Sequence, residues 1–146
     1  MTPLVSAIDT STDLWKRVLR RSTTDAIIWL TTTAADGTPQ PNPVWFIDDG
    51  DDLVIYSKPN QAKLTNIGRN PHISCHLQSD IYGDDVQILT GTARIVDPAT
   101  ISTETLDRYM AKYAEGIASL GSTPEKFAAA YSVGIRFTPG KLRGWT

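Results

Sequence analysis

Residues 39–71 constrain the fold more than any other part of this chain. They are typical of a strand over Pro41–Ile47, a tight turn at Asp48–Asp51 and a returning strand over Leu53–Ser57, followed by a short helix. Because proline cannot donate to a strand ladder, the first of these strands is predicted to lie at the edge of its sheet. Gly50 gives the turn a residue that adopts positive φ at low cost. The stretch therefore predicts a sheet built from hairpins.

Two lysines flank the start of the predicted helix. Lys58 and Lys63 lie on either side of a Pro-Asn pair, and Asn60 is the expected N-cap of a helix that runs to Gly68. Free N–H groups at a helix start, together with two cations, suit a phosphate, and Ser57 adds a hydroxyl. The alternative is that both lysines are ordinary solvated surface residues.

The composition is that of a globular protein with a single domain over 1–146. The chain has 146 residues, of which 40% are hydrophobic and 21% charged. No apolar run approaches the roughly 20 residues needed to cross a membrane. The segment MTPLVSAIDTSTD lacks the pattern of a signal peptide, and Cys75 is the single cysteine, so we expect a cytoplasmic protein. The net charge of −2, without a basic tract, argues against a nucleic-acid partner.

The remaining segments predict a mostly β fold of the α+β class. Further strands are expected over 26–33, 72–78, 86–96, 132–138 and 141–145. Gly91, inside the long third strand of this set, predicts a bulge or a bend. Because helices and strands do not alternate regularly, the pattern favours an antiparallel β-barrel with short helices outside it.

Three helices are predicted outside residues 39–71. Thr10–Asp13 resembles a capping box that opens a helix to about Arg21, with Leu14, Val18 and Leu19 as its buried stripe. A second helix is expected over 102–120, with a stripe of apolar residues: Leu106, Tyr109, Met110 and Tyr113. A third begins at Thr123-Pro124, because proline favours the first helical position.

Other chemically suggestive residues have simpler interpretations. His72 and His76 lie four apart on a strand, about 13 Å from each other, which is too far for both to bind one metal ion. Each is better explained as a structural histidine, although His76 has the alternative of facing a cofactor pocket. Cys75 is predicted to be a buried, unreactive thiol. The basic residues of the first helix are expected to form a solvated face, or alternatively a docking site for an acidic tail: Lys16, Arg17, Arg20 and Arg21.

Several phrases of the sequence resemble one known family. PNPVWF, then DGDDLVIYS, a lysine-bearing helix ending in RNP, HISCHLQ, TGTARIVD and IRFTPGKLRGWT are similar to the split-barrel flavin and deazaflavin oxidoreductases. This is the pyridoxamine 5′-phosphate oxidase-like superfamily, and the resemblance covers about residues 15 to 146. It implies an FMN-binding-like split barrel. The segment PVWF is similar to the corresponding segment of the branch that binds the deazaflavin F420, which is found largely in actinobacteria.

The resemblance also implies a cofactor site and a homodimer with two such sites at its interface. Phosphate contacts are implied for Ser57, Lys58 and Lys63, and ring contacts for Asn42, Pro43, Val44 and Trp45. Either Gln87 or the terminal Arg143–Trp145 would complete the site, from the same chain or from the second subunit, and His76 is a further candidate from its place on a strand. Members that make pyridoxal phosphate carry an arginine in the strand occupied here by Val44–Ile47; this chain has none, which favours F420 over FMN.

The leading hypothesis is therefore an F420-dependent reductase of small conjugated or quinone-like acceptors. The first alternative is an FMN-dependent oxidoreductase of the same fold. The second is a non-catalytic protein that binds F420, flavin or haem, and it is supported by the absence of any acid–base dyad in the sequence. Water, the cofactor's hydroxyl and His76 are all open as proton donors, and the substrate remains undefined.

Overall fold

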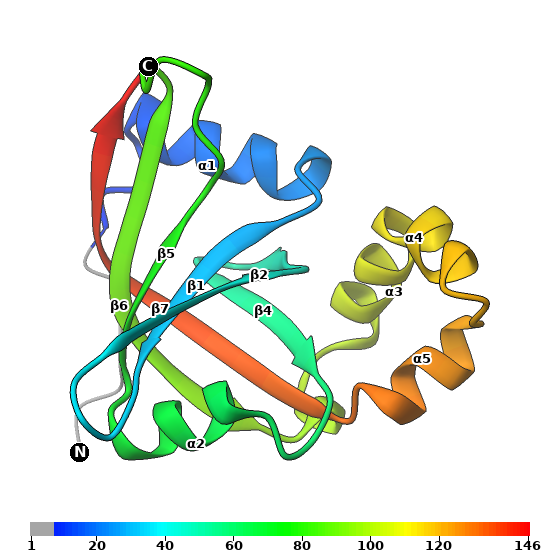
Figure 1. The fold of residues 1–146 in the computed structure, drawn as a ribbon. Helices are drawn as coiled ribbons and strands as arrows, with labels where there is room; N and C mark the ends of the chain where they lie inside the picture. Colours follow the sequence, from blue (N-terminus) through cyan, green and yellow to red (C-terminus); the bar gives the residue numbers. More distant parts are fainter. Residues whose placement is uncertain (1–7) are drawn as a thin grey trace.

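The computed structural model describes residues 8–146, and their strands form one curled antiparallel sheet (Figure 1). The spatial order is β2-β1-β5-β6-β7-β4-β3. The strands are β1 (Ile28–Thr33), β2 (Pro39–Val44), β3 (Ile47–Asp49), β4 (Asp52–Ser57), β5 (His72–His76), β6 (Val86–Val96) and β7 (Val133–Trp145). Residues 1–7, which supply part of the argument about a signal peptide, lie outside the described residues.

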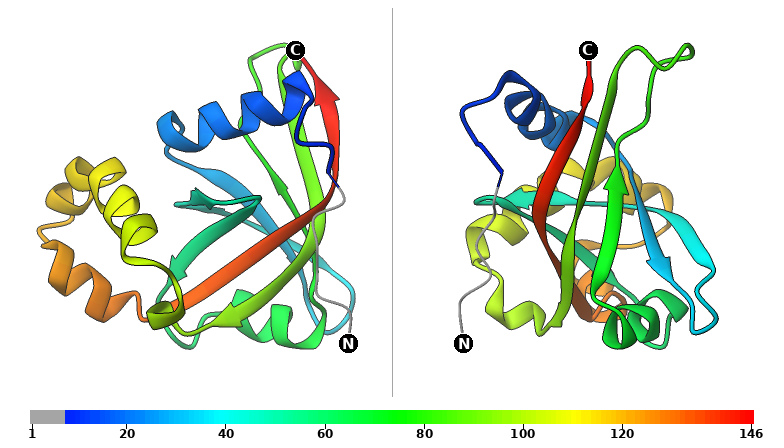
Figure 2. Two further views of the ribbon diagram at one scale, coloured as in Figure 1. Left: turned by 180° about the vertical axis from the view of Figure 1, so that it is seen from behind. Right: turned by 90° about the vertical axis from the view of Figure 1, so that its left-hand side faces the viewer.

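Five α-helices of the described chain surround the sheet. They are α1 (Asp13–Thr24), α2 (Ala62–Arg69), α3 (Thr103–Lys112), α4 (Ala114–Ser119) and α5 (Pro124–Ala130), with a 3-10 turn η1 (Pro98–Thr100) before α3. Helices α1 and α2 lie at opposite ends of the curled sheet, and α3 to α5 form a layer at its side (Figures 1 and 2). The architecture confirms the predicted split barrel with short peripheral helices.

Two hydrophobic cores share strand β4. Its side chains alternate in direction, so Leu53 and Ile55 enter the core inside the curled sheet, whereas Val54 and Tyr56 enter a second core beneath α3 to α5. Every residue from Leu53 to Ser57 is buried. A strand covered on both faces has no need for polar alternation, which explains the unbroken apolar run LVIY in the sequence.

The predicted strand over Pro41–Ile47 is two strands at opposite edges of the sheet. β2 pairs only with β1, and β3 pairs only with β4. The chain crosses from one edge to the other through Trp45 and Phe46, so the predicted long hairpin is reduced to the short β3–β4 pair. The prediction of an edge strand with prolines is confirmed for β2, whose residues 39, 41 and 43 are all proline.

The crossing residues are held by side chains of the α3–α4 corner. Phe46 is fully buried, and its N–H donates to the Tyr113 hydroxyl at 2.8 Å. The Phe46 carbonyl accepts from Lys112 Nζ at 2.8 Å and from the Tyr113 hydroxyl at 3.1 Å. Lys112 also donates to the carbonyl of Ser22 at 2.6 Å, at the end of α1. Side chains thus replace the strand partner that the backbone of Phe46 lacks.

Helix α1 differs in detail from its prediction. Its N-cap is Thr12, whose hydroxyl accepts from the N–H of Trp15 at 3.2 Å, and no acidic residue completes a capping box. Its buried residues are Trp15, Val18 and Ser22, while Leu14 and Leu19 are only partly buried. Trp15 lies next to Leu14 in the sequence, and a shift of the apolar face by one residue accounts for the difference.

The C-terminal elements also depart from the predicted boundaries. The helix expected over 102–120 is divided at Tyr113, where the backbone leaves helical geometry (φ −106°, ψ 15°). The two last predicted strands are one strand, β7, which pairs with β6 along its length. The helix from Thr123-Pro124 is confirmed as α5, with the Thr123 hydroxyl as its N-cap.

The predicted irregularity at Gly91 is confirmed as a shift in the β6–β7 register between Thr90 and Gly91. A Cβ atom placed on Gly91 would lie 2.2 Å from the carbonyl oxygen of Thr138 and 2.9 Å from the amide nitrogen of Gly140. Both are backbone atoms of the paired strand, which cannot move away without breaking the ladder. Only glycine fits at this position.

We therefore expect Gly91→Ala to lower the free energy of unfolding by about 2–4 kcal/mol, since a methyl group would force the two strands apart. Gly68→Ala is the matched control, because Gly68 lies in helix α2 with no atom within 4 Å of an added Cβ. In that control, the free energy of unfolding should rise by roughly 0.4–1 kcal/mol. Urea unfolding of both variants measures the difference, and equal stabilities would contradict the steric argument.

Lys112 predicts a pH dependence of stability. Burial lowers the pKa of Lys112 to about 8, although Asp25 and Asp48 act in the opposite direction. An unfolded lysine titrates near pH 10.4, so between these values the unfolded state binds more protons and stability rises with pH. Between pH 7.5 and 10, the free energy of unfolding of the wild type should rise by about 1–2 kcal/mol relative to that of Lys112→Met. This is less than the full pKa shift would give, because the amine keeps some solvent contact.

Urea unfolding of the two proteins at several pH values measures this difference. The comparison cancels the contribution of buried tyrosines, whose ionisation lowers the stability of both proteins at high pH. A difference between the two proteins that stays constant with pH would show that Lys112 titrates in the folded protein as it does in water.

Candidate functional site

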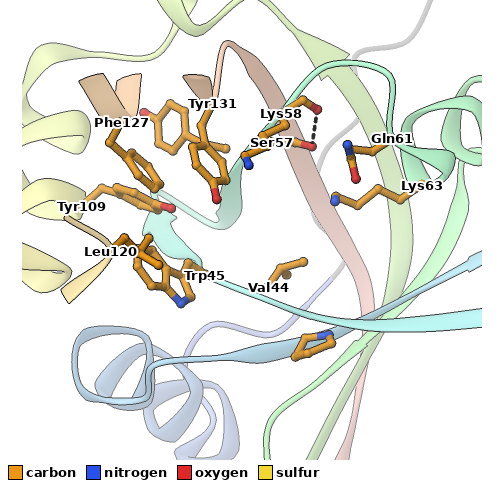
Figure 3. A pocket seen from close by; sticks show the side chains of 12 residues that line it. Val44, Trp45, Ser57, Lys58, Gln61, Lys63, Tyr109, Leu120, Phe127 and Tyr131 are labelled. Carbon is orange, nitrogen blue, oxygen red and sulfur yellow. Dashed lines mark hydrogen bonds between the residues drawn. The ribbon is translucent and has the colours of Figure 1, made fainter. Parts of the chain in front are cut away.

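A cavity of about 280 Å³ opens where the ends of β2 and β4 meet the start of α2 and the helical layer (Figure 3). Its walls come from segments far apart in the sequence. The lining residues are Pro43, Val44, Trp45, Tyr56, Ser57, Lys58, Gln61, Lys63, Tyr109, Leu120, Phe127 and Tyr131. We call this cavity the main pocket.

One end of the main pocket is cationic. Lys58 and Lys63 lie there beside Gln61, and the lining that the structure describes contains no aspartate or glutamate (Figure 3). Lys63 is partly buried, and this burial lowers the pKa of its ammonium group. Two cations without a carboxylate partner in the pocket make this end suitable for an anion.

The start of helix α2 adds to this positive end. The N-cap is Gln61 and not Asn60 as predicted, because Asn60 takes a left-handed conformation with φ 62° that ends the preceding turn. Gln61 makes no side-chain cap, and the N–H of Leu64 donates to the Gln61 carbonyl at 3.0 Å, so the N–H groups of Ala62 and Lys63 are left for another partner. Lys63 is the second residue of the helix and therefore still lies in its first turn.

The side chains of Ser57 and Lys58 both make contacts within the chain. The Ser57 hydroxyl donates to the carbonyl of Lys58 at 2.8 Å, so only its lone pairs remain free (Figure 3). Lys58 Nζ lies 5.6 Å from the centre of the Tyr131 ring, which is a cation–π distance. Lys58 therefore stands at the border between the cationic end and the rest of the main pocket.

The opposite end of the main pocket is aromatic. Trp45 stacks on Tyr113 with a centroid distance of 4.4 Å and on Phe127 at 5.7 Å. Phe127 in turn stacks on Tyr131 at 4.0 Å. These flat, closely packed rings suit a planar ligand, which would find an apolar wall at one end and positive charge at the other.

Six of the nine predicted site residues line the main pocket: Pro43, Val44, Trp45, Ser57, Lys58 and Lys63. Asn42, His76 and Gln87 do not line it. Asn42 is exposed on β2, opposite Leu30 in the ladder. Their assignment to a site remains a prediction.

Gln87 and His76 have partners elsewhere in the chain. The Gln87 side chain accepts from Arg21 at 2.5 Å and donates to Asp85 at 2.8 Å, so its amide is satisfied within this network. His76 stacks on Trp29 with a centroid distance of 6.3 Å. In the C-terminal segment, the Trp145 indole donates to the carbonyl of Gly83 at 2.7 Å.

The basic residues of α1 are only partly a solvated face. Arg17 forms an ion pair with Asp85, and the pKa of that carboxyl is held well below its usual range, chiefly by this hydrogen bond. Arg21 pairs with Asp25 at 2.6 Å, whereas Lys16 and Arg20 are exposed. The prediction that all four are solvated is therefore wrong for the two arginines that pair.

Cys75 is fully buried, as predicted, and burial raises the pKa of its thiol. In residues 8–146, no three His, Cys, Asp or Glu side chains come together as metal ligands. The same part of the chain holds no helix with the length and hydrophobicity that a membrane crossing requires.

Periodicity in the sequence does not identify the residues of the aromatic end that belong to the helical layer. Tyr109 was part of the predicted apolar stripe, yet its period gives no indication of which cavity it faces. Phe127 and Tyr131 lie four residues apart near the predicted α5, and this spacing places two rings on one helix face. This pair of rings was the one indication in the sequence that the helix contributes to an aromatic site.

Residues 14–146 match the family model described as pyridoxamine 5′-phosphate oxidase. No curated protein matches the chain by sequence at the significance required.

Solved structures with similar folds carry different descriptions. One described as an F420 reductase is 25% identical with a TM-score of 0.60, covering 88% of this chain and 94% of its own. A conserved hypothetical protein from Mycobacterium tuberculosis is 18% identical with a TM-score of 0.68, covering 99% and 89%. HutZ, a haem storage protein from Vibrio cholerae, is 14% identical with a TM-score of 0.66, covering 91% and 95%.

The cationic end leads to a prediction for Lys63. Without ligand, Lys63→Ala should keep or slightly raise stability, by about 0.3–1 kcal/mol, because a lysine opposes the dipole at a helix start. The variant should nevertheless bind F420 or FMN about 10- to 100-fold more weakly, since a charged hydrogen bond is worth about 1.5–3 kcal/mol.

Fluorescence titration at low salt measures the binding, and Lys126→Ala is the matched control because Lys126 is exposed on α5 and does not line the main pocket. If Lys63→Ala and Lys126→Ala bind the cofactors equally well, Lys63 points into solvent and holds no phosphate.

Proposed function

This chain belongs to the pyridoxamine 5′-phosphate oxidase family, and we propose that it is an F420-dependent oxidoreductase that transfers a hydride to a small conjugated or quinone-like acceptor. The observation that carries the proposal is the division of the main pocket into a cationic end and an aromatic end. This arrangement suits a flat ring with a phosphate attached to it. The family is one of flavin-binding proteins, and F420 combines such a ring with a phosphate.

The residues present fit the phosphate of such a cofactor. Lys58, Lys63 and the uncapped first turn of α2 supply positive charge and N–H donors, and no carboxylate of the described pocket lining opposes them. A phosphate there would satisfy groups that otherwise face the pocket without an anionic partner. Lys63 would act as the closest cation because it emerges from the helix itself.

The ring would lie along the strand segment that leads to the crossing. Pro43 and Val44 form one side of the main pocket and Trp45 leads toward its aromatic end. The absence of arginine between Val44 and Ile47 favours F420 over FMN, as the sequence resemblance implies. A similar fold described as an F420 reductase, at 25% identity, adds support for this choice.

When bound, reduced F420 supplies the hydride, and the protein supplies binding, orientation and exclusion of water. The titratable side chains that line the main pocket are two lysines and three tyrosines. Burial raises the pKa of Tyr109, so this phenol stays protonated over the physiological range. The aromatic wall would hold the acceptor against the ring, and exclusion of water from the filled pocket would favour the transfer.

A second candidate function is a cofactor or haem carrier without turnover. It is favoured by the similar fold of HutZ, described as a haem storage protein, and by the absence of an acid–base pair in the described pocket lining. The FMN-dependent oxidoreductase remains the alternative within the enzyme class.

We also propose a homodimer with the site at its interface. Residues 39–43 of the edge strand β2 are all exposed, and Pro43, at the end of this stretch, lines the main pocket. A symmetric partner would cover this edge and close the open side of the site. The substrate class and the cytoplasmic location likewise stay proposals; the first follows from the family resemblance, and the second from the N-terminal segment and the single cysteine.

Two titrations test the proposed function. Purified protein should bind F420 more tightly than FMN, measured by quenching of tryptophan fluorescence, since Trp45 lines the main pocket. Reduced F420 should then be oxidised in the presence of a panel of quinones and conjugated ketones. Equal or tighter binding of FMN would reverse the choice of cofactor, and tight F420 binding without turnover would favour the carrier.

A further inference from the structure

Tyr56 has a buried hydroxyl without a partner. The residue is 8% exposed, and in residues 8–146 its Oη is the one buried side-chain nitrogen or oxygen that makes no hydrogen bond. Leaving such a group unsatisfied costs free energy, so each case calls for an explanation. Tyr56 lines the main pocket and packs edge-on against Tyr109, at a centroid distance of 4.7 Å.

A second, smaller cavity of about 50 Å³ adjoins the same tyrosine. It lies between β4, the 3-10 turn and helices α3 and α5. Its lining residues are Tyr56, Pro98, Leu106, Met110, Phe127, Ala128 and Tyr131. We call it the rear cavity. Tyr56, Phe127 and Tyr131 line both the rear cavity and the main pocket, so these three side chains are the wall between them.

Tyr131 is the part of this wall that is best able to move. Phe127 is 3% exposed and lies in the second core, whereas Tyr131 is only partly buried and follows the last residue of α5. Figure 3 shows the Tyr131 side chain between Phe127 and Lys58, within the main pocket. A rotation of the Tyr131 ring would join the two cavities without disturbing a strand or a helix.

The rear cavity is poorly suited to water. A buried water molecule needs two to four polar partners, and the side chains that line this cavity are apolar apart from the two tyrosines. An apolar group that carries a single oxygen matches this lining better. The apolar part would contact Leu106 and Met110, and the oxygen would accept a hydrogen bond from Tyr56.

We propose that the rear cavity is a hidden continuation of the main pocket, which takes the oxygen-bearing end of an apolar acceptor and presents the Tyr56 hydroxyl to that oxygen. The inference rests on the proposed function where it identifies the ligand as the acceptor. It adds a chemical requirement: the acceptor carries a carbonyl or hydroxyl oxygen at the end remote from the cationic residues.

A pair of ligands and one substitution test this requirement. The probes are 2-methyl-1,4-naphthoquinone and 2-methylnaphthalene, which share a ring skeleton and differ in the oxygens. We expect Tyr56→Phe to raise the dissociation constant of the quinone about 5- to 20-fold and to change that of the hydrocarbon less than twofold. Without ligand, the variant should melt no lower than the wild type, because it loses an unsatisfied hydroxyl.

Filling the rear cavity gives an independent test. Leu106 lines the rear cavity, whereas Ile81 lines neither cavity and is 90% exposed. Leu106→Phe should abolish the preference for the quinone over the hydrocarbon, whereas Ile81→Phe, which places the same ring at an exposed position, should retain it. Thermal melting of both variants establishes that they are folded.

The inference is overturned if Tyr56→Phe changes the binding of both probes equally or of neither, or if Leu106→Phe keeps the preference. Titration of the wild type with F420 and FMN separates this result from the proposed function. Binding of neither cofactor, together with the expected quinone preference, would refute the proposed function and support the rear cavity. Tight F420 binding without the preference would refute only the rear cavity.

Discussion

The curled sheet depends on the hydrogen bonds that side chains make to the backbone of Phe46. A chain that passes between two sheet edges leaves its peptide groups without ladder partners, and such groups are costly when buried. Tyr113 and Lys112 satisfy both polar groups of Phe46 from a helix corner more than 60 positions later. The break between α3 and α4 places these two side chains there, so the helical layer fixes the sheet as much as the sheet supports the layer.

The main pocket is a consequence of the same crossing. Because the chain leaves β2 at Val44, the next residue, Trp45, turns away from the sheet and stacks against Tyr113 and Phe127. The cationic end forms independently, where β4 gives way to α2. A ligand that spans both ends therefore contacts β2, β4 and the helical layer at once, which joins ligand binding to the stability of the whole fold.

The sequence predicted elements whose signals are local. The long strand with Gly91 and the helix beginning at Thr123-Pro124 are confirmed because alternation and capping act within a few residues. The division of Pro41–Ile47 was missed because Val44–Ile47 is a continuous apolar run, which is typical of one strand. Only distant side chains make a break at Phe46 favourable. In the same way, the lysines near α2 were recognised as a pair, whereas the rings of the helical layer reach the main pocket through tertiary packing, which periodicity does not specify.

Strands β6 and β7 pair directly at Val96 and Gly134, so the whole helical layer is an insertion within a single hairpin. The β6–β7 ladder is formed by the backbone, so it does not depend on which side chains the helices present to the main pocket. Lining residues that are not part of the buried core, such as Leu120 and Tyr131, can therefore be replaced while the strands that hold the cationic end are kept. The strands that hold the cationic end are thus constrained by their ladder, whereas the helical layer is free to change side chains at the main pocket. Relatives that share one cofactor would therefore be able to differ in the acceptor they bind.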